Sequence, residues 1–392
     1  MIDKKLNEHC TGCFACQNAC GLGAIQFKSN SEGFFYPVVD YGKCVECGKC
    51  VNICPALHPV STKAYDQPQV HAAWHVDDQI RVASTSGGVF TALAEAVLRD
   101  GGYVVGAYYD QDFTIRHGII HDADDIQRLR QSKYAQSWVG DVFKEVKALL
   151  AKKELVLFCG TPCQSAGLQH YLGRDYDNLI CCDFICRGVI SPKVYEKFLR
   201  DMRPDQDTAP AKVHFKNKDF GWNRFSTKLT FEDGSIYHKD RNQDYYMRGY
   251  LKHNLYLRQS CHQCRYKELP RISDLSLGDF WGIGNYDKTL DNEHGTSVIL
   301  VNSQKGRQLI ERAKERLVIC ERSIDEVLAG NSCLLNSAAP GKYRAYFFKN
   351  MDKYPFSTLI ERIDRMNAKV PLKVKVRGYL SVLKRKIIKP HN

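Results

Sequence analysis

The sequence lacks any hydrophobic run long enough to cross a membrane, because no window approaches the roughly 18 apolar residues that a spanning helix needs. Residues 1–9 are polar and lack the apolar segment of a secretory signal peptide. We therefore expect a protein of the reducing cytoplasm, where its 17 cysteines ligate metals and form no disulfide framework. A chain of 392 residues is long enough for two or three domains with hydrophobic cores. Its hydrophobic content of 44% is ordinary for a globular protein.

Eight of the cysteines form two matched runs near the N-terminus. Each run has the spacing C-x2-C-x2-C-x3-C, and Pro55 follows the second run. This spacing is typical of bacterial ferredoxins, in which the fourth cysteine of each run ligates the other 4Fe-4S cluster. We assign one cluster to Cys10, Cys13, Cys16 and Cys54, and the other to Cys44, Cys47, Cys50 and Cys20.

Two other interpretations of these runs are weaker. Zinc sites usually use cysteine pairs separated by longer gaps, and a disulfide framework needs an oxidising compartment. Gly21 stands where the ferredoxin pattern usually has proline, but this difference removes no ligand. Such a small unit has little hydrophobic core, so we expect the clusters to supply its folding energy.

The net charge of +12 does not describe the body of the protein. Eight of these charges lie within residues 369–389, a stretch without any acidic residue, which leaves +4 for the remainder. A 4Fe-4S cluster with its four thiolates carries about −2, so several clusters would offset much of that remainder. The charge therefore gives no support to nucleic-acid binding.

Strand and helix patterns alternate after the cysteine runs. Residues 1–58 read as a two-cluster 4Fe-4S ferredoxin domain, and residues 59–69 read as a linker that contains Pro59 and Pro68. Strand patterns lie at residues 33–39, 70–76, 103–109, 115–121, 155–159 and 178–185, and helix patterns lie at residues 84–99, 141–152, 164–171, 192–202 and 305–316. Asp233-Gly234 predicts a hairpin turn. The predicted class is α+β, with a small ferredoxin-like domain followed by a mixed α/β body.

The C-terminal stretch mixes aliphatic residues with its eight basic ones. One interpretation is a basic amphipathic helix that makes peripheral contact with an anionic membrane surface. The other is a helix that caps the body and keeps its lysines in water. Trp and Phe, which often anchor interfacial helices, are missing here.

A further set of cysteines lies outside the two runs. Cys163 and Cys186 each follow a strand pattern, and Cys261 and Cys264 form a C-x-x-C pair. Together they would make a third four-thiolate site, for which the spacing leaves iron–sulfur, zinc or a redox disulfide open. Four other cysteines read as small buried hydrophobes: Cys181, Cys182, Cys320 and Cys333.

Six blocks that follow one another along the chain carry a family resemblance. They are STSGGVF at 84–90, SKYAQS at 132–137, GTPCQ at 160–164, DFIC at 183–186, CHQC at 261–264 and GDFW at 278–281. In this order they resemble the coenzyme F420 hydrogenase/dehydrogenase beta-subunit family, fused to an N-terminal two-cluster ferredoxin. The resemblance implies a flavin-binding region at residues 70–180 and a C-terminal region with a third cluster at residues 181–345. The basic tail, which we place at residues 346–392, lies outside the resemblance.

The resemblance also implies cofactors and their ligands. It places Ser86, Gly87, Gly88, Lys133, Tyr134, Gln136, Ser137, Thr161 and Gln164 around FAD. It places Cys163, Cys186, Cys261 and Cys264 around a third 4Fe-4S cluster. Basic Lys133 would stabilise an anionic reduced flavin, whereas Arg187 replaces the usual histidine of the family and puts a proton-transfer role there in doubt.

The implied function is that of an iron–sulfur flavoprotein oxidoreductase that passes electrons between 4Fe-4S clusters and a flavin. Its substrate would be coenzyme F420 or an intermediate of polysaccharide biosynthesis. Its electron donor or acceptor would be a ferredoxin, a reduced deazaflavin or a partner subunit of low potential. The alternatives are a non-catalytic subunit that relays electrons inside a larger complex, and a scaffold protein at the membrane.

Overall fold

The structure is a computed structural model that describes residues 1–59 and 65–368. Its strands are β1 (Ile25–Ser29), β2 (Phe35–Val39), β3 (Gln69–His75), β4 (Tyr103–Tyr109), β5 (Ile115–Ile120), β6 (Val156–Cys159), β7 (Leu179–Phe184), β8 (Pro210–Asn217), β9 (Ser226–Phe231), β10 (Ile236–Asp240), β11 (Leu275–Asp279), β12 (Ser297–Val301) and β13 (Leu317–Arg322). Its α-helices are α1 (Ile2–Leu6), α2 (Ala15–Ala19), α3 (Lys49–Asn52), α4 (Asp78–Ala83), α5 (Val89–Arg99), α6 (Ile126–Leu129), α7 (Val142–Ala151), α8 (Pro162–Leu172), α9 (Pro192–Asp201), α10 (Tyr245–Met247), α11 (Gln304–Ala313), α12 (Ile324–Gly330), α13 (Arg344–Asn350) and α14 (Phe356–Ala368).

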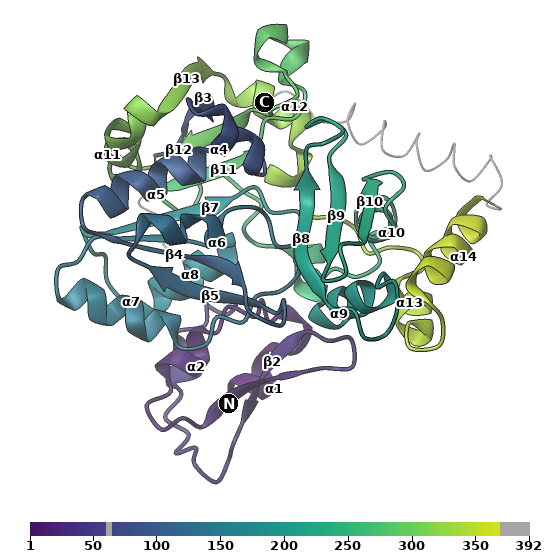
Figure 1. Ribbon diagram of the computed structural model, residues 1–392. Helices are drawn as coiled ribbons and strands as arrows, with labels where there is room; N and C mark the ends of the chain where they lie inside the picture. The colour runs from purple at the N-terminus through teal and green to yellow at the C-terminus, as the bar shows by residue number, and fades with distance from the viewer. Residues whose placement is uncertain (60–64, 369–392) are drawn as a thin grey trace, which may run out of the picture.

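An eight-stranded mixed sheet runs through the body in the order β13-β3-β12-β11-β7-β6-β4-β5 (Figure 1). Strands β4, β6, β7 and β11 are parallel to their neighbours within this group. The remaining pairs, towards both ends of the sheet, are antiparallel. The mixed α/β body that the alternating patterns predict is therefore confirmed.

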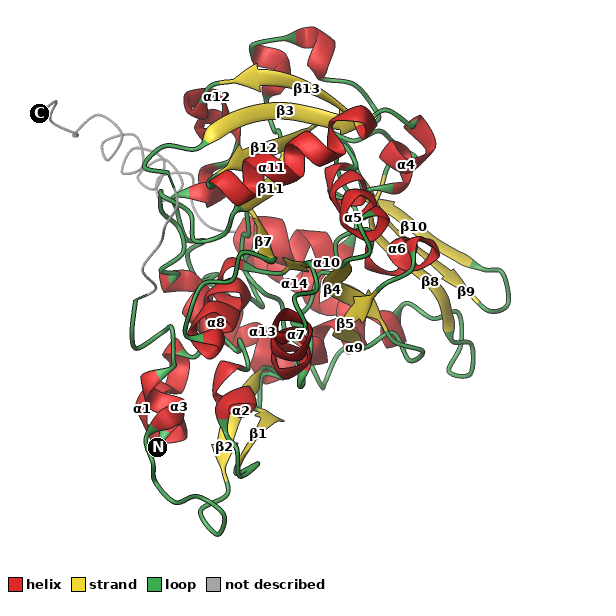
Figure 2. Ribbon diagram, turned by 90° about the vertical axis from the view of Figure 1, so that its left-hand side faces the viewer, coloured by secondary structure: helices red, strands yellow, loops and turns green. Residues whose placement is uncertain are grey.

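Helices cover both faces of this sheet, because its central strands are apolar at almost every position (Figure 2). Val104 and Leu157 share a hydrophobic cluster with residues of α5 and α11. Val105 and Phe158, their neighbours in sequence, share a different cluster with residues of α7 and α8. Successive strand residues point to opposite faces, so strands of this composition are buried on both sides.

The N-terminal module, residues 1–59, packs against the body through a common hydrophobic cluster (Figure 1). Strands β1 and β2 pair antiparallel, with Ile25 opposite Val39. The ring of Phe14 stacks on Phe27 with 3.9 Å between centroids and meets Trp138 of the body edge-on at 4.9 Å. The module and the body therefore share one core.

A second, three-stranded sheet in the order β10-β9-β8 lies beside the large one. Its β9–β10 hairpin turns at Gly234, whose φ of +82° suits glycine, as the sequence predicts. Residues of α9, α10, α13 and α14 pack beneath this sheet in an aromatic-rich core.

The predicted basic tail at residues 346–392 begins inside α13. Its first part, up to residue 368, lies in α13 and α14, whose Phe347 and Phe356 are buried in the core. The predicted amphipathic helix from Val370 lies outside the described residues. Among the helices within residues 1–59 and 65–368, none has the length and hydrophobicity to span a bilayer.

The predicted helix at residues 84–99 starts later than expected. Residues 84–88 form a loop, and α5 begins at Val89 after Gly88, whose φ is +86°. A short helix, α4, precedes the loop and was not predicted; the carboxylate of Asp77 accepts a hydrogen bond from the backbone N–H of Gln79 at 2.8 Å and caps it. The loop between the two helices is the segment that reaches the candidate site.

The core beneath the second sheet provides a test of the fold. Phe198 of α9 is fully buried, and its ring contacts Tyr246 at 4.9 Å and Phe356 at 5.3 Å between centroids. We predict that Phe198→Ala lowers the free energy of unfolding by about 3–5 kcal/mol, because it leaves a cavity among these rings. Urea denaturation measures the loss, with exposed Ile236→Ala as the control. A loss below about 1 kcal/mol would contradict this packing.

Candidate functional site

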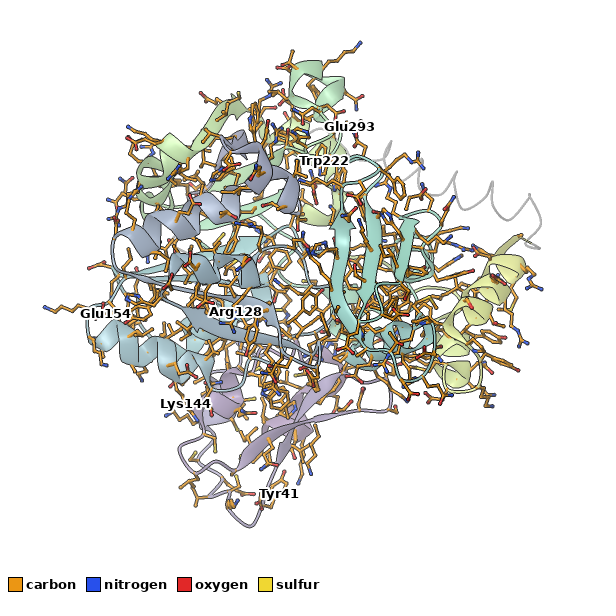
Figure 3. The ribbon with its side chains drawn as sticks, in the orientation of Figure 1. Tyr41, Arg128, Lys144, Glu154, Trp222 and Glu293 are labelled. Carbon is orange, nitrogen blue, oxygen red and sulfur yellow. The ribbon has the colours of Figure 1, made fainter. Side chains whose placement is uncertain are left out.

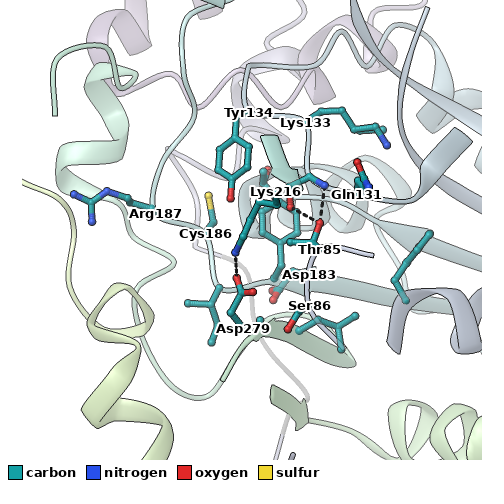
Figure 4. Close-up of a pocket in the computed structure, with 18 of the residues that line it drawn as sticks. Thr85, Ser86, Gln131, Lys133, Tyr134, Asp183, Cys186, Arg187, Lys216 and Asp279 are labelled. Carbon is teal, nitrogen blue, oxygen red and sulfur yellow. Dashed lines mark hydrogen bonds and ion pairs between the residues drawn. The ribbon is translucent and has the colours of Figure 1, made fainter. Parts of the chain in front are cut away.

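A cavity of about 490 Å³ opens at the carboxyl ends of the parallel strands. Its walls come from the loops after β6, β7 and β11, from the segment at residues 84–91 and from the segment at residues 129–137. Open α/β sheets bind ligands outside the carboxyl ends of their strands, and the volume is typical of small-molecule pockets. The close-up in Figure 4 shows side chains from these loops around the cavity.

The loop at residues 84–88 is held tightly against the sheet. The backbone N–H of Gly87 donates to Ser297 Oγ at 2.8 Å, and Ser86 Oγ donates to the carbonyl of Thr296 at 2.8 Å. A Cβ at Gly87 would lie only 2.4 Å from the carbonyl oxygen of Ala73, so no larger residue fits. Ser86 and Gly88 line the cavity, whereas Gly87 is not part of the lining.

Lys133 and Tyr134 both line the cavity. The ammonium of Lys133 donates to the carbonyls of Arg128, Leu129 and Arg130 at 3.0, 3.0 and 2.7 Å, so it caps the end of α6. Burial lowers the pKa of Lys133 to about 7. The hydrogen bonds of the Lys133 ammonium are therefore made to backbone carbonyls at the end of α6.

Thr161, Gln164 and Ser137 form one hydrogen-bonded group on the cavity wall. Thr161 and Gln164 make a capping box at the start of α8, in which Gln164 Oε1 accepts from the backbone N–H of Thr161 at 2.9 Å. Gln164 Nε2 then donates to Ser137 Oγ at 3.0 Å. All three predicted residues line the cavity.

Gln136 is used elsewhere and does not line the cavity. Its Oε1 accepts from the backbone N–H of Phe35 at 3.1 Å and from the guanidinium of Arg258 at 3.0 Å. These contacts tie the body to the N-terminal module. The structure thus shows a joining role for a residue that the resemblance places at the flavin.

His117 was not among the predicted site residues. This residue of β5 lines the cavity and is 7% exposed. Neither of its ring nitrogens has a well-aligned hydrogen-bond partner within the described ranges, although the backbone of Cys159 lies near enough to favour protonation of the ring. Burial lowers its pKa to about 4. The available signal was a histidine among apolar residues in a strand pattern, which is equally typical of a core histidine.

A second group missed from the predicted site is centred on Asp279. Its carboxylate pairs with Lys216 at 2.7 Å (Figure 4). It also accepts a hydrogen bond from Trp222 Nε1 at 2.9 Å. The ammonium of Lys216 also lies 4.6 Å from the ring centroid of Trp281. Asp279 and Trp281 belong to the GDFW block, which carries part of the family resemblance. The sequence alone assigns no role to Asp279 within that block.

The predicted cysteine ligands fall into three sets. The first set is Cys10, Cys13, Cys16 and Cys54; the second is Cys20, Cys44, Cys47 and Cys50; the third is Cys163, Cys186, Cys261 and Cys264. In the part of the chain that the structure describes, no three His, Cys, Asp or Glu side chains close around a single-ion position.

Thiols of the first set lie near one another inside the protein. Burial raises the pKa of Cys13 to about 12, and the neighbouring thiols of Cys54 and Cys10 add to the rise. The second set spans a range of exposure: Cys47 is exposed, Cys20 and Cys44 are half-buried, and Cys50 is buried.

The four thiols of the third set are half-buried, whereas those of the first set are buried, but both sets show raised thiol pKa values. Burial raises the pKa of Cys186 to about 12 and that of Cys261 to about 11, and in each case nearby thiols of the set oppose ionisation further. The other three thiols of the set also raise the pKa of Cys163, which lies in α8. Buried thiolates in such groups are stable only with a shared cationic centre, which fits the donor chemistry of an iron–sulfur cluster. Cys186 also lines the cavity.

Three family models of known proteins match successive segments of this chain between residues 9 and 327. Residues 9–57 match the family model of a "4Fe-4S dicluster domain". Two further models describe the beta subunit of coenzyme F420 hydrogenase/dehydrogenase: residues 70–144 match the model of its N-terminal part, and residues 153–327 match that of its C-terminal part. The N-terminal module is therefore a 4Fe-4S ferredoxin-type domain.

Individual proteins are more distantly similar. One subunit of the F(420)H(2) dehydrogenase of Methanosarcina mazei is 20% identical over 326 residues, which cover 80% of this chain and 85% of the relative. Coenzyme F420-dependent sulfite reductase of Methanocaldococcus jannaschii is 25% identical over 178 residues, which cover 43% of this chain and 27% of that protein. A chain in the xenon-derivatised F420-reducing NiFe hydrogenase complex from Methanosarcina barkeri aligns with a TM-score of 0.46 and 15% identity, covering 77% of this chain and 95% of that one.

The buried imidazole of His117 predicts a pH-dependent stability. Because its pKa is lowered to about 4 in the folded protein, the unfolded chain binds a proton more readily between about pH 6.5 and pH 4. The stabilisation from the neutral ring is therefore present above this window and is lost as the pH falls through it.

As the pH is lowered through this window, we expect the free energy of unfolding of the natural protein to fall relative to that of His117→Leu, by about 1.4 kcal/mol per pH unit. Urea denaturation at several pH values measures it, and the exposed His58→Leu variant is the control. A difference that does not change with pH would contradict the burial of a neutral imidazole at this position.

Proposed function

Because this chain belongs to the coenzyme F420 hydrogenase/dehydrogenase beta-subunit family, we propose that it is an iron–sulfur flavoprotein oxidoreductase. Electrons would pass between the 4Fe-4S clusters of its ferredoxin-type module and a flavin in the cavity. The observation that carries the proposal is Cys186, which belongs to the third set and also lines the cavity. A cluster held by this set would therefore adjoin a cofactor bound there.

The cavity is suited to a flavin in its size and in its lining. Its volume of about 490 Å³ is ample for a flavin ring system, and Ile115, Leu129 and Leu277 supply apolar surface. Serine and glycine residues before α5 place backbone N–H groups beside it, which suits a phosphate. A bound flavin would supply the chemistry that links one-electron carriers to a two-electron hydride donor or acceptor.

Two residues would act on a bound ring through their charge state and position. His117, which lies outside the predicted flavin set, would offer a neutral imidazole to a ring nitrogen or carbonyl, because its nitrogens have no well-aligned partner in the residues described. Lys133 would add positive charge nearby in its protonated form, which its pKa of about 7 makes sensitive to pH, although its ammonium is held by three carbonyls. A carbonyl-held ammonium would act through its field and not by direct contact.

The proposed substrate is a deazaflavin coenzyme of the F420 type, since both relatives described above are named for that coenzyme. The ion pair of Lys216 with Asp279, together with Arg241, gives the other wall of the cavity the charges that a phosphorylated, carboxylate-bearing substrate would contact. The partner would be a low-potential donor or acceptor, either a ferredoxin or a partner subunit. The relatives reported above are not named for polysaccharide biosynthesis, and we do not propose that role.

A relay without catalysis is the second candidate. The Methanosarcina mazei relative is named as one subunit of a dehydrogenase, so this chain would then only pass electrons to a substrate site on another subunit. Flavin content separates the two candidates.

Anaerobic purification followed by iron, sulfide and flavin quantification tests the proposal. We predict about twelve iron atoms and one FAD per chain, and about eight iron atoms in the Cys163→Ser/Cys186→Ser variant. Cys320→Ser, which changes a half-buried thiol outside the three sets, should keep the full content.

Eight iron atoms and no flavin in the natural protein would overturn the flavoprotein proposal and favour the relay. Twelve iron atoms in the double variant would overturn the assignment of the third set.

A further inference from the structure

The junction between the N-terminal module and the body brings two of the cysteine sets together. Helix α8 carries Cys163 in its first turn and Gly167 one turn later, so the two residues lie on the same face. A Cβ at Gly167 would lie 2.9 Å from both Cβ and Sγ of Cys13. Cys13 of the first set therefore contacts α8, the helix that carries Cys163 of the third set, and only glycine at position 167 allows this approach.

A second contact at the junction is made by Arg258, which is fully buried. Its guanidinium donates to the carbonyl of Cys10 at 2.7 Å, to the carbonyl of Phe35 at 3.0 Å and to Gln136 Oε1 at 3.0 Å. The 3-10 helix at Gln259–Gln263, which contains Cys261, follows it directly and packs on the 3-10 helix at Asn7–His9 of the module. Arg258 thus lies between the backbone of the first set and that of the third.

The charge of Arg258 has no carboxylate partner within residues 1–59 and 65–368, where all its hydrogen-bond acceptors are neutral oxygens. The face of the Tyr36 ring, 4.1 Å away, compensates the charge only in part. A buried cation without an anionic partner is strongly unfavourable. Clusters held by four thiolates carry about −2, so two of them beside the guanidinium would provide the missing counter-charge.

Tyr266 marks the same junction from another side. Its side chain is buried, and its hydroxyl has no hydrogen-bond partner among the described residues. Thiols of the third set, Cys163 and Cys264, and thiols of the first set, Cys13 and Cys54, all act on it electrostatically. The ring therefore lies within range of both sets.

The second set reaches from the core of the module, where Cys50 is buried beside the first set, to the surface. Cys47 is exposed, and Val45 beside it is 71% exposed. Tyr41, close to this set in sequence, lies at the end of the module farthest from the body (Figure 3). The second set is the one that an external redox partner could approach.

We propose that electrons cross this protein in the order second set, first set, third set and cavity, or in reverse, and that Arg258 is the positioning residue that joins the first and third sets and raises both their reduction potentials. This inference rests on the proposed presence of clusters at all three sets. It assigns an order and a tuning residue that the occupancy of those sets alone does not give.

Redox titration of the anaerobic full-length protein, monitored by electron paramagnetic resonance, tests the inference. Arg258→Met removes the charge but keeps an unbranched side chain, and Arg258→Lys keeps the charge. Arg312→Met, at an exposed residue of α11, is the matched control. Cys47→Ser identifies the signal of the second set.

Loss of a positive charge makes reduction of a nearby cluster less favourable. We expect Arg258→Met to lower the ratio of reduced to oxidised cluster at a fixed potential at least tenfold for the first and third sets, which is about 59 mV for a one-electron couple. The second set should change less than threefold, and Arg258→Lys should recover most of the loss. Equal shifts at all three sets, or a shift confined to the second set, would overturn the role of Arg258.

A separate variant tests the contact itself, including the case in which Arg258→Met loses iron. Gly167→Ala must push Cys13 away from α8, so the magnetic interaction between the reduced first and third sets should weaken. Gly21→Ala, where an added Cβ meets nothing within 4 Å, should leave that interaction unchanged. An unchanged interaction in Gly167→Ala would overturn the order.

A failure of the proposed function can be distinguished from a failure of the role of Arg258. If the natural protein binds only eight iron atoms, the third set is empty and the proposed function fails. Arg258→Met would then still shift the first set relative to the second if the guanidinium acts as described.

Discussion

The burial of charge at the junction of module and body is the constraint on which the rest of the structure depends. The cysteines of the first set are buried in the core around Phe14 and Trp138, the guanidinium of Arg258 is buried beside them, and the half-buried third set adjoins this region. Each would be costly alone in a medium of low dielectric constant, and together they compensate one another. The hydrophobic contacts exclude water, and the charges then require a close and fixed approach of the two parts.

This approach explains why the two parts share a core and are not simply tethered. A flexible linker would give the module a high effective concentration near the body but no defined geometry. Gly167 against Cys13, and Gln136 between Phe35 and Arg258, fix the geometry by short contacts. The large sheet contributes by placing Cys163 and Cys186 after neighbouring strands β6 and β7, at the edge where its cavity opens. Fold, docking and proposed chemistry therefore use the same few loops.

Much of this architecture follows from local sequence patterns. The cysteine spacing predicted the ferredoxin-type module, and apolar runs such as the one in β7 predicted strands, because these signals depend on neighbouring residues alone. The start of α5 was placed too early, since serine and glycine at residues 84–88 are compatible with both a loop and a helix cap. The sequence carries no sign of the places of His117 in the cavity wall and of Gln136 between module and body for a different reason. Their roles depend on residues more than a hundred positions away or on a cavity that exists only after folding.

The central claim is that three clusters lie in a line that ends at a flavin in the cavity. Diffraction from anaerobically grown crystals of the natural protein, recorded on both sides of the iron absorption edge, tests it most directly. The account predicts anomalous iron peaks at all three cysteine sets, with the first set between the other two, and flavin density bounded by Cys186, His117 and the loop at residues 84–88. Iron confined to the N-terminal module, with an empty cavity, would contradict it.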